Sequence, residues 1–369
     1  MLNTYPGEVA TATAAHERGS IDDITIMANP PTEKRRPRWL RWAVVLIPWL
    51  WFLVRDLHPL VEAAAILLPV LIGGAVGVVL LFGAYFRSLP LAALAASLTV
   101  LYLVAVLAPG RPVSAQPPIA ETARFGSINL AQQFFTYNDL GFFVEDRELS
   151  VFFGTELQRT HDAELRTRFE HGLSDVAGEA ANPSSLEPTL DVAGTYREDD
   201  FPSIGLYSDF PITILDDPIS AQIPGGLPGF RAQLATDQGD IVVYALHVPR
   251  PGLGSGLFEV TLSEQNDMLE AIADAVEAED LPVVVLGDLN IVDRGAAFDD
   301  FTDGLDDAMR SDRWARATRS RDLWHILLQL RIDHILISDG LCSANAQSPQ
   351  LLLSNHDPVM VDIGPCAAN

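Results

Sequence analysis

The first 110 residues contain long apolar stretches that few charges interrupt. Residues 63–86 and 88–109 carry no charged side chain. At about 1.5 Å per helical residue, each stretch is long enough to cross a hydrocarbon core of about 30 Å. The segment 39–54 is free of charge only from residue 42, but flanking arginines can extend to the headgroups and its tryptophans suit the interface. We therefore expect three transmembrane helices within residues 38–109, with an amphipathic or re-entrant helix as the alternative for the first.

The basic residues before the first apolar segment predict the orientation of the chain. Lysine and arginine cluster at positions 34–41, and the positive-inside bias keeps such a cluster in the cytoplasm. Three crossings then place residues 110–369 outside, in a multi-pass protein of the cell membrane. Residues 1–37 are expected to be a disordered cytoplasmic tail, and residues 110–123 a proline-rich linker.

The remainder of the chain, 124–369, alternates short apolar runs with turns and one clear helical pattern. Residues 262–279 place apolar side chains at helical spacing with acids between them. Seven runs have strand character: 124–133, 149–157, 203–215, 240–248, 282–290, 331–340 and 358–364. Strand-rich segments with few helices and long loops predict a domain of mixed α and β structure, built as a sandwich of sheets.

The net charge of −25 comes from the part of the chain after the expected membrane helices. Residues 109–369 hold 16 basic and 42 acidic side chains. Such a field repels polyanions, which disfavours long nucleic acid as the substrate, and it favours metal cations. Lys34 is the only lysine, so the composition also fits a salt-rich habitat or a biased genome. We infer no protein partner.

Both cysteines, Cys342 and Cys366, lie in the part expected to be outside. An oxidising compartment favours a disulfide between them, whereas two isolated buried thiols are the alternative.

Polar residues stand at the ends of the predicted strands. Each one alone is typical of a turn or a cap. Together they form a set that could carry chemistry: Asn129, Glu156, His247, Asp288, Asn290, Asp333 and His356.

The order of these motifs resembles the endonuclease/exonuclease/phosphatase superfamily over residues 124–364. The matching pieces are Ile128-Asn129-Leu130, Thr155-Glu156, Gly205-Leu206-Tyr207-Ser208, Leu246-His247, Gly287-Asp288-Leu289-Asn290, Arg331-Ile332-Asp333-His334-Ile335-Leu336 and Ser354-Asn355-His356-Asp357-Pro358-Val359. The resemblance implies an α+β fold, the DNase I-like four-layer α/β/β/α sandwich, here preceded by a transmembrane helical segment. A membrane-spanning N-terminus followed by an outside domain is similar to the membrane-anchored branch of the superfamily.

The resemblance also implies a role for each residue of the set. Asn129 and Glu156 would bind Mg²⁺ or Mn²⁺, which prefer carboxylate and amide oxygens. His356 would be the general base, oriented by Asp333. His247 would act as an acid toward the leaving group. Asp288 and Asn290 would position the attacking water and the phosphate.

The sequence departs from the family pattern near its C-terminal histidine. Asn355 stands where the family usually has an aspartate, which favours one metal ion over two because an amide carries no negative charge. Thr155 and Asp209 replace the usual Gln and Arg, which bears on substrate preference.

The sequence therefore predicts a membrane-tethered, extracytoplasmic, metal-dependent phosphoesterase. Its substrate would be a phosphate mono- or diester, lipid-linked or small. The alternatives are an extracellular nuclease of the same fold and a catalytically inactive binding module attached to the envelope.

Overall fold

The structure is a computed structural model, and it describes residues 40–54, 59–107, 122–130, 139–174, 204–223, 225–250, 262–311, 318, 327–349 and 354–367. The expected tail at 1–37, with most of its basic cluster, lies outside the described residues. The same holds for all but the last two residues of the expected linker at 110–123.

Two helices near the N-terminus are long and apolar enough to cross a membrane, at Ala64–Phe86 and Leu89–Val106. They belong to α3 (Pro59–Phe86) and to α4 (Leu89–Tyr102), which η2 (Leu103–Leu107) continues. Large apolar side chains on both helices are exposed, with Leu81 at 73% and Leu89 at 75%. Their length and composition agree with the two longer expected spans.

The segment expected as the first span is not one continuous α-helix. Pro48 lacks an N–H and cannot donate to a carbonyl of the preceding turn. Ser97 of α4 supplies a donor there, because its Oγ donates to the Val45 carbonyl at 2.8 Å and accepts from Trp49 Nε1 at 2.9 Å. The segment consists of three short pieces, α1 (Leu40–Ala43), η1 (Val44–Leu50) and α2 (Trp51–Val54).

The rest of the described chain forms two six-stranded sheets. The first has the order β11-β12-β1-β2-β4-β3, with β1 (Ala123–Asn129), β2 (Val151–Thr155), β3 (His171–Ser174), β4 (Ile204–Ser208), β11 (Leu341–Gln347) and β12 (Val359–Pro365). The second has the order β5-β6-β7-β8-β10-β9, with β5 (Ile212–Ile214), β6 (Gly229–Thr236), β7 (Gly239–His247), β8 (Val283–Asp288), β9 (Leu305–Asp307) and β10 (Asp333–Ser338).

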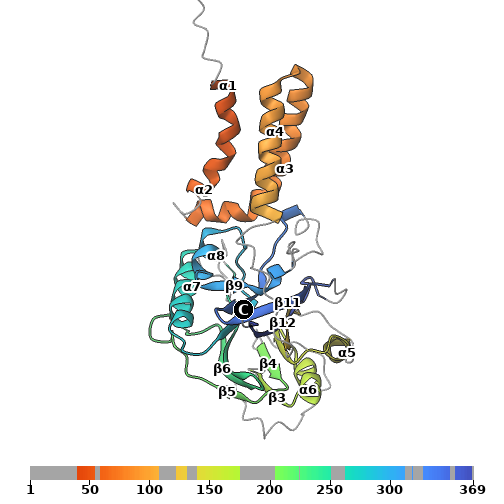
Figure 1. The fold of residues 1–369 in the computed structure, drawn as a ribbon, viewed down its shortest axis with the longest axis vertical. Coiled ribbons are helices and arrows are strands. Elements are labelled where there is room, and N and C mark those ends of the chain that lie inside the picture. Colours follow the sequence, from red (N-terminus) through yellow and green to blue (C-terminus); the bar gives the residue numbers. More distant parts are fainter. Residues whose placement is uncertain are drawn as a thin grey trace, which may run out of the picture. The chain divides into compact units, whose positions relative to one another are not determined.

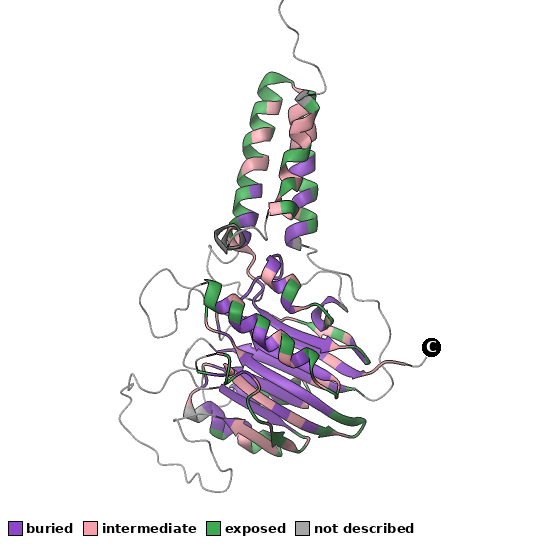
Figure 2. Ribbon diagram, turned by 90° about the vertical axis from the view of Figure 1, so that its left-hand side faces the viewer, coloured by how far each residue is buried: buried purple, intermediate pink, exposed green. Residues whose placement is uncertain are grey.

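The two sheets pack face to face, and helices cover their outer faces (Figure 1). One apolar core lies between the sheets and includes Phe153 and Leu286, both fully buried. The central strands are accordingly buried along nearly their whole length (Figure 2). Each sheet has a further apolar core on its outer face, between the sheet and its helices. The first sheet packs against α5 (Asp139–Asp146) and α6 (Arg159–Arg168). The second sheet packs against α7 (Leu262–Glu277) and α8 (Ala296–Phe301).

This arrangement is the DNase I-like four-layer α/β/β/α sandwich, so the predicted fold class is confirmed. The predicted helix at 262–279 is α7, which ends at Glu277. The structure also contains the disulfide between Cys342 and Cys366. It links β11 to the end of β12, two strands that pair antiparallel.

Candidate active site

Strand topology brings the predicted polar residues to one edge of the sandwich. In the first sheet, the parallel strands β1 and β2 end in register, so that Asn129 pairs with Thr155 and Glu156 follows directly. In the second sheet, the parallel strands β7 and β8 end with His247 beside Asp288. Strand β10 runs antiparallel to β8, which places Asp333, its first residue, opposite Asp288.

Asn129 connects the two sheets through its side chain. Its Nδ2 donates to Glu156 Oε1 at 3.1 Å, next to its own strand. The same nitrogen donates to Asp288 Oδ2 at 2.9 Å, on the other sheet. One buried amide thus holds two carboxylates of the site together.

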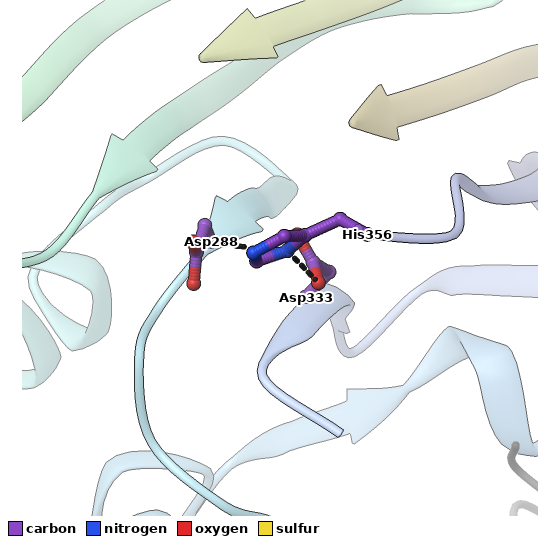
Figure 3. A group of neighbouring side chains, drawn as sticks. All are labelled: Asp288, Asp333 and His356. Atoms are coloured by element: carbon purple, nitrogen blue, oxygen red, sulfur yellow. Dashed lines mark hydrogen bonds and ion pairs between the residues drawn. The ribbon is translucent and has the colours of Figure 1, made fainter. Parts of the chain in front are cut away.

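His356 forms a pair with Asp333 (Figure 3). Its Nδ1 lies 2.9 Å from Asp333 Oδ2 and 4.0 Å from Asp288 Oδ2. Both members of the pair are buried, with side-chain exposures of 4% and 0%. A carboxylate at Nδ1 fixes the orientation of the imidazole and assigns proton exchange to Nε2.

Ser354 fixes the backbone of His356, a role that the sequence did not reveal. Its Oγ accepts from the His356 N–H at 3.0 Å and donates to the Asn129 carbonyl at 2.6 Å. Ser354 begins the motif Ser354-Asn355-His356-Asp357-Pro358-Val359, and its position two residues before the histidine is the only feature of the sequence that points to this role.

The family profile of the endonuclease/exonuclease/phosphatase family matches residues 181–356, a range that contains the His247, Asp288, Asp333 and His356 positions. These residues belong to this family. No curated protein sequence matches the chain.

Several solved structures are similar to the chain. An endonuclease/exonuclease/phosphatase from Beutenbergia cavernae DSM 12333 is 18% identical, with a TM-score of 0.47 over 67% of this chain and 72% of that one. An endonuclease/exonuclease/phosphatase from Bacteroides vulgatus is 16% identical, with a TM-score of 0.48 over 66% of this chain and 99% of that one. A humanised TDP2 of D. rerio with 14 mutations is 14% identical, with a TM-score of 0.45 over 66% and 99%.

Burial and neighbouring charges shift the pKa values of Asp288 and His247 in this chain. Burial, together with the neighbouring charge of Asp333, raises the pKa of Asp288 to about 6. Burial lowers the pKa of His247, whose Nε2 lies 4.0 Å from Asp288 Oδ2. His247 is therefore mainly the neutral imidazole at neutral pH.

Asn290 acts on the site through its backbone. Its N–H donates to Asp288 Oδ1 at 3.0 Å, while its side-chain Nδ2 donates to the Val248 carbonyl at 2.9 Å. It adopts a left-handed conformation with φ of 50°, which asparagine tolerates better than most residues. Asn290 therefore stabilises the conformation of the loop after β8.

The donor set of the site fits the divalent cation that family members typically use. Within the described residues, Asp288, Asp333 and His356 form a group whose ligand atoms lie within 4.8 Å of one another. Asp333 Oδ1 is buried without a hydrogen-bond partner, and so is Asn355 Oδ1. Buried carboxylate oxygens that repel each other are stabilised by a hard cation. This group differs from the expected metal pair, Asn129 and Glu156, and the hydrogen bonds of Asn129 connect the two sets.

Proposed function

We propose that this protein is a membrane-tethered, extracytoplasmic, metal-dependent phosphoesterase. The observation that supports the proposal is the buried His356–Asp333 pair beside three acid and amide side chains at the joint edge of two sheets. Attack of water on a phosphate ester requires a base for the water and a cation at the phosphoryl oxygens, and these side chains can provide the base and the oxygen ligands for the cation.

His356 is the general base of the proposed reaction. Nδ1 is held by Asp333, so Nε2 accepts a proton from the attacking water. The water oxygen then bonds to phosphorus while the bond to the leaving oxygen breaks. Asp333 stabilises the imidazolium that forms.

Glu156 and Asn129 are the proposed cation ligands, and Asn129 also donates a hydrogen bond to Asp288 on the other sheet. A Mg²⁺ or Mn²⁺ ion held by these residues would supply positive charge that offsets the negative charge of the phosphoryl oxygens. Asn129 reaches both carboxylates, so the side chains converge on one small volume. The amide at Asn355 favours a single ion.

His247 and Asn290 complete the site in the proposed mechanism. His247 is neutral before substrate binds, and it donates a hydrogen bond toward the leaving oxygen rather than carrying a permanent positive charge. Asn290 holds Asp288 in place through its backbone N–H, and Asp288 positions the water and the phosphate.

The proposed membrane anchor is the hairpin of α3 and α4, preceded by the shorter apolar segment at 40–54. Arg87 lies in the turn between the two helices. A basic residue in a short loop favours the cytoplasmic side, which agrees with the cluster at 34–41 if the first segment also crosses. Both signals leave the catalytic domain outside.

The proposed substrate is a lipid-linked or small phosphate ester. The acidic charge of the domain repels long polyanions, whereas the apolar helices keep the site close to lipids.

The activity test uses the full-length protein in detergent with Mg²⁺ or Mn²⁺. Its substrates are bis(p-nitrophenyl) phosphate, phospholipid, polyprenyl phosphate and DNA. We expect hydrolysis of a lipid or small ester. Degradation of DNA alone would identify a nuclease instead, and inactivity on all four with either ion would indicate a binding module.

Two variants test the division of roles. His356→Ala should lower kcat by about 10²–10⁴-fold, the usual contribution of a general base, with the Mg²⁺ concentration for half activity unchanged. Glu156→Gln should raise that Mg²⁺ concentration. The controls are His171→Ala at the sheet edge and Glu270→Gln on the exposed face of α7. If excess Mg²⁺ rescued His356→Ala but not Glu156→Gln, His356 would have to be a metal ligand.

A further inference from the structure

Pro69 leaves a backbone carbonyl of α3 without its usual partner. It lies inside α3 and has no N–H, so the carbonyl four residues earlier, that of Ala65, loses its intrahelical hydrogen bond. Ala65 itself is completely buried. A buried carbonyl of this kind needs a donor from elsewhere.

Arg294 supplies that donor. Its Nε donates to the Ala65 carbonyl at 2.6 Å, and its Nη2 donates to the Ile66 carbonyl at 3.2 Å. The guanidinium is buried, with the residue 2% exposed. An arginine side chain from the catalytic domain thus bonds to the first turns of a candidate membrane span.

The same guanidinium also binds a second loop of the domain. Its Nη1 donates to the Gln329 carbonyl at 2.9 Å, and its Nη2 donates to the Leu328 carbonyl at 2.8 Å. The planar fork of arginine suits this task, because it directs several donors to fixed positions at once.

Both loops lead directly to the candidate active site. Arg294 ends the loop that follows Asp288, and residues 328–332 precede Asp333. An apolar cluster accompanies the hydrogen bonds, since Val292 and Ile332, one from each loop, pack with Ala65. The contact with α3 therefore lies one residue from Asp333 and four residues from Asp288.

We propose that Arg294 is a positioning residue that fixes the two catalytic loops on α3, so that this helix is a structural part of the active site. The proposal rests on the proposed function for its kinetic readout only. Arg294 does not touch the reacting atoms. It acts by holding Asp288 and Asp333 at the separation that the reaction needs.

The first test measures kinetics of the full-length protein in detergent with Mg²⁺ and bis(p-nitrophenyl) phosphate. Arg294→Gln should lower kcat roughly 10- to 100-fold with KM nearly unchanged, the scale expected for an ångström-sized misplacement of catalytic groups. Arg294→Lys should recover part of the loss. Arg168→Gln, an exposed arginine on α6, is the matched control. An unchanged kcat in Arg294→Gln would overturn the proposal.

The second test measures hydrogen exchange and needs no activity. Arg294→Gln should raise exchange of the amides in residues 289–294 and 329–333 and leave α7 unchanged. Equal exchange in the wild type and the variant would overturn the proposal, even in an active enzyme. If no ester is hydrolysed but exchange rises in both loops, the proposed function fails and the role of Arg294 stands.

A third variant guards against loss of folding. Pro69→Ala keeps Arg294 intact and returns an N–H that competes for the Ala65 carbonyl. We expect increased exchange in both loops and a smaller fall in kcat than in Arg294→Gln. If Arg294→Gln does not fold, no change in either readout for Pro69→Ala would overturn the proposal.

Discussion

Replacing Asp307 by asparagine should destabilise the two-sheet domain strongly, although Asp307 is not one of the predicted site residues. Its Oδ1 accepts from Arg331 Nη2 at 2.7 Å, and its Oδ2 accepts from Arg310 Nε at 3.2 Å. Asp293 Oδ2 joins both arginines, at 3.1 Å from Arg310 and 3.2 Å from Arg331. All four side chains are buried.

The pKa of Asp307 gives the scale of the effect. Burial alone would raise this pKa, but the charge and hydrogen bonds of Arg331 outweigh burial and lower it from 3.8 to about 2. At about 1.4 kcal/mol per pKa unit, the ionised form contributes about 2 kcal/mol at neutral pH. The asparagine also leaves the positive charge of Arg331 buried with one negative charge fewer beside it, and breaking a buried ion pair costs about 3–5 kcal/mol. We therefore expect a loss of about 2–5 kcal/mol.

The assay is thermal unfolding of the full-length protein in detergent, followed by near-ultraviolet circular dichroism. A loss of this size lowers the midpoint by roughly 5–15 °C for a domain of this length. Asp303→Asn, an exposed neighbour, is the control. Because the folded pKa is lowered, the contribution is complete above pH 3.8 and fades as the pH falls toward 2. The gap between wild type and Asp307→Asn should therefore shrink over this range, and a constant gap or an unchanged midpoint would refute the reasoning.

The remaining predictions concern backbone space and the disulfide. Gly287→Ala should prevent folding or lower the midpoint by more than 10 °C by the same assay, since Gly287 has φ of 138° and a Cβ there would lie 1.9 Å from the Leu246 oxygen. An alanine variant as stable as the wild type would contradict this geometry. Replacing Cys342 and Cys366 together by serine should cost about 3 kcal/mol in chemical denaturation, because the bridge closes a loop with a separation of 24 residues. Equal denaturation midpoints for oxidised and serine forms would count against the bridge.

The position of the candidate site could be predicted from the sequence because strands end where their apolar runs end. Asn129, His247 and Asp288 each close such a run, and the structure places all three at one edge. The bond from Asn129 to Asp288 could not be predicted, because it depends on how one sheet lies over the other. No apolar pattern specifies that registry.

Helix α6 shows why part of the fold was missed. Its buried positions include the polar residues Asp162 and Glu164. Asp162 Oδ1 accepts from the Tyr207 hydroxyl at 2.7 Å, and Glu164 Oε1 accepts from the Gly141 N–H at 3.1 Å. Such a helix packs through hydrogen bonds to its neighbours, so the periodicity of apolar residues does not reveal it.

The hydrogen bond between Asn129 and Asp288 makes the geometry of the candidate site depend on the thickness of the core between the sheets. One partner belongs to each sheet, and the side chains between the sheets, Phe153 and Leu286 among them, set how far apart the sheets stand. Close-packed interiors transmit changes of volume instead of absorbing them. A methyl group added or removed in the core, far from any substrate, would thus change the reach of the amide across the gap. Substitutions of core residues that only fill space would then also change the rate of the proposed hydrolysis.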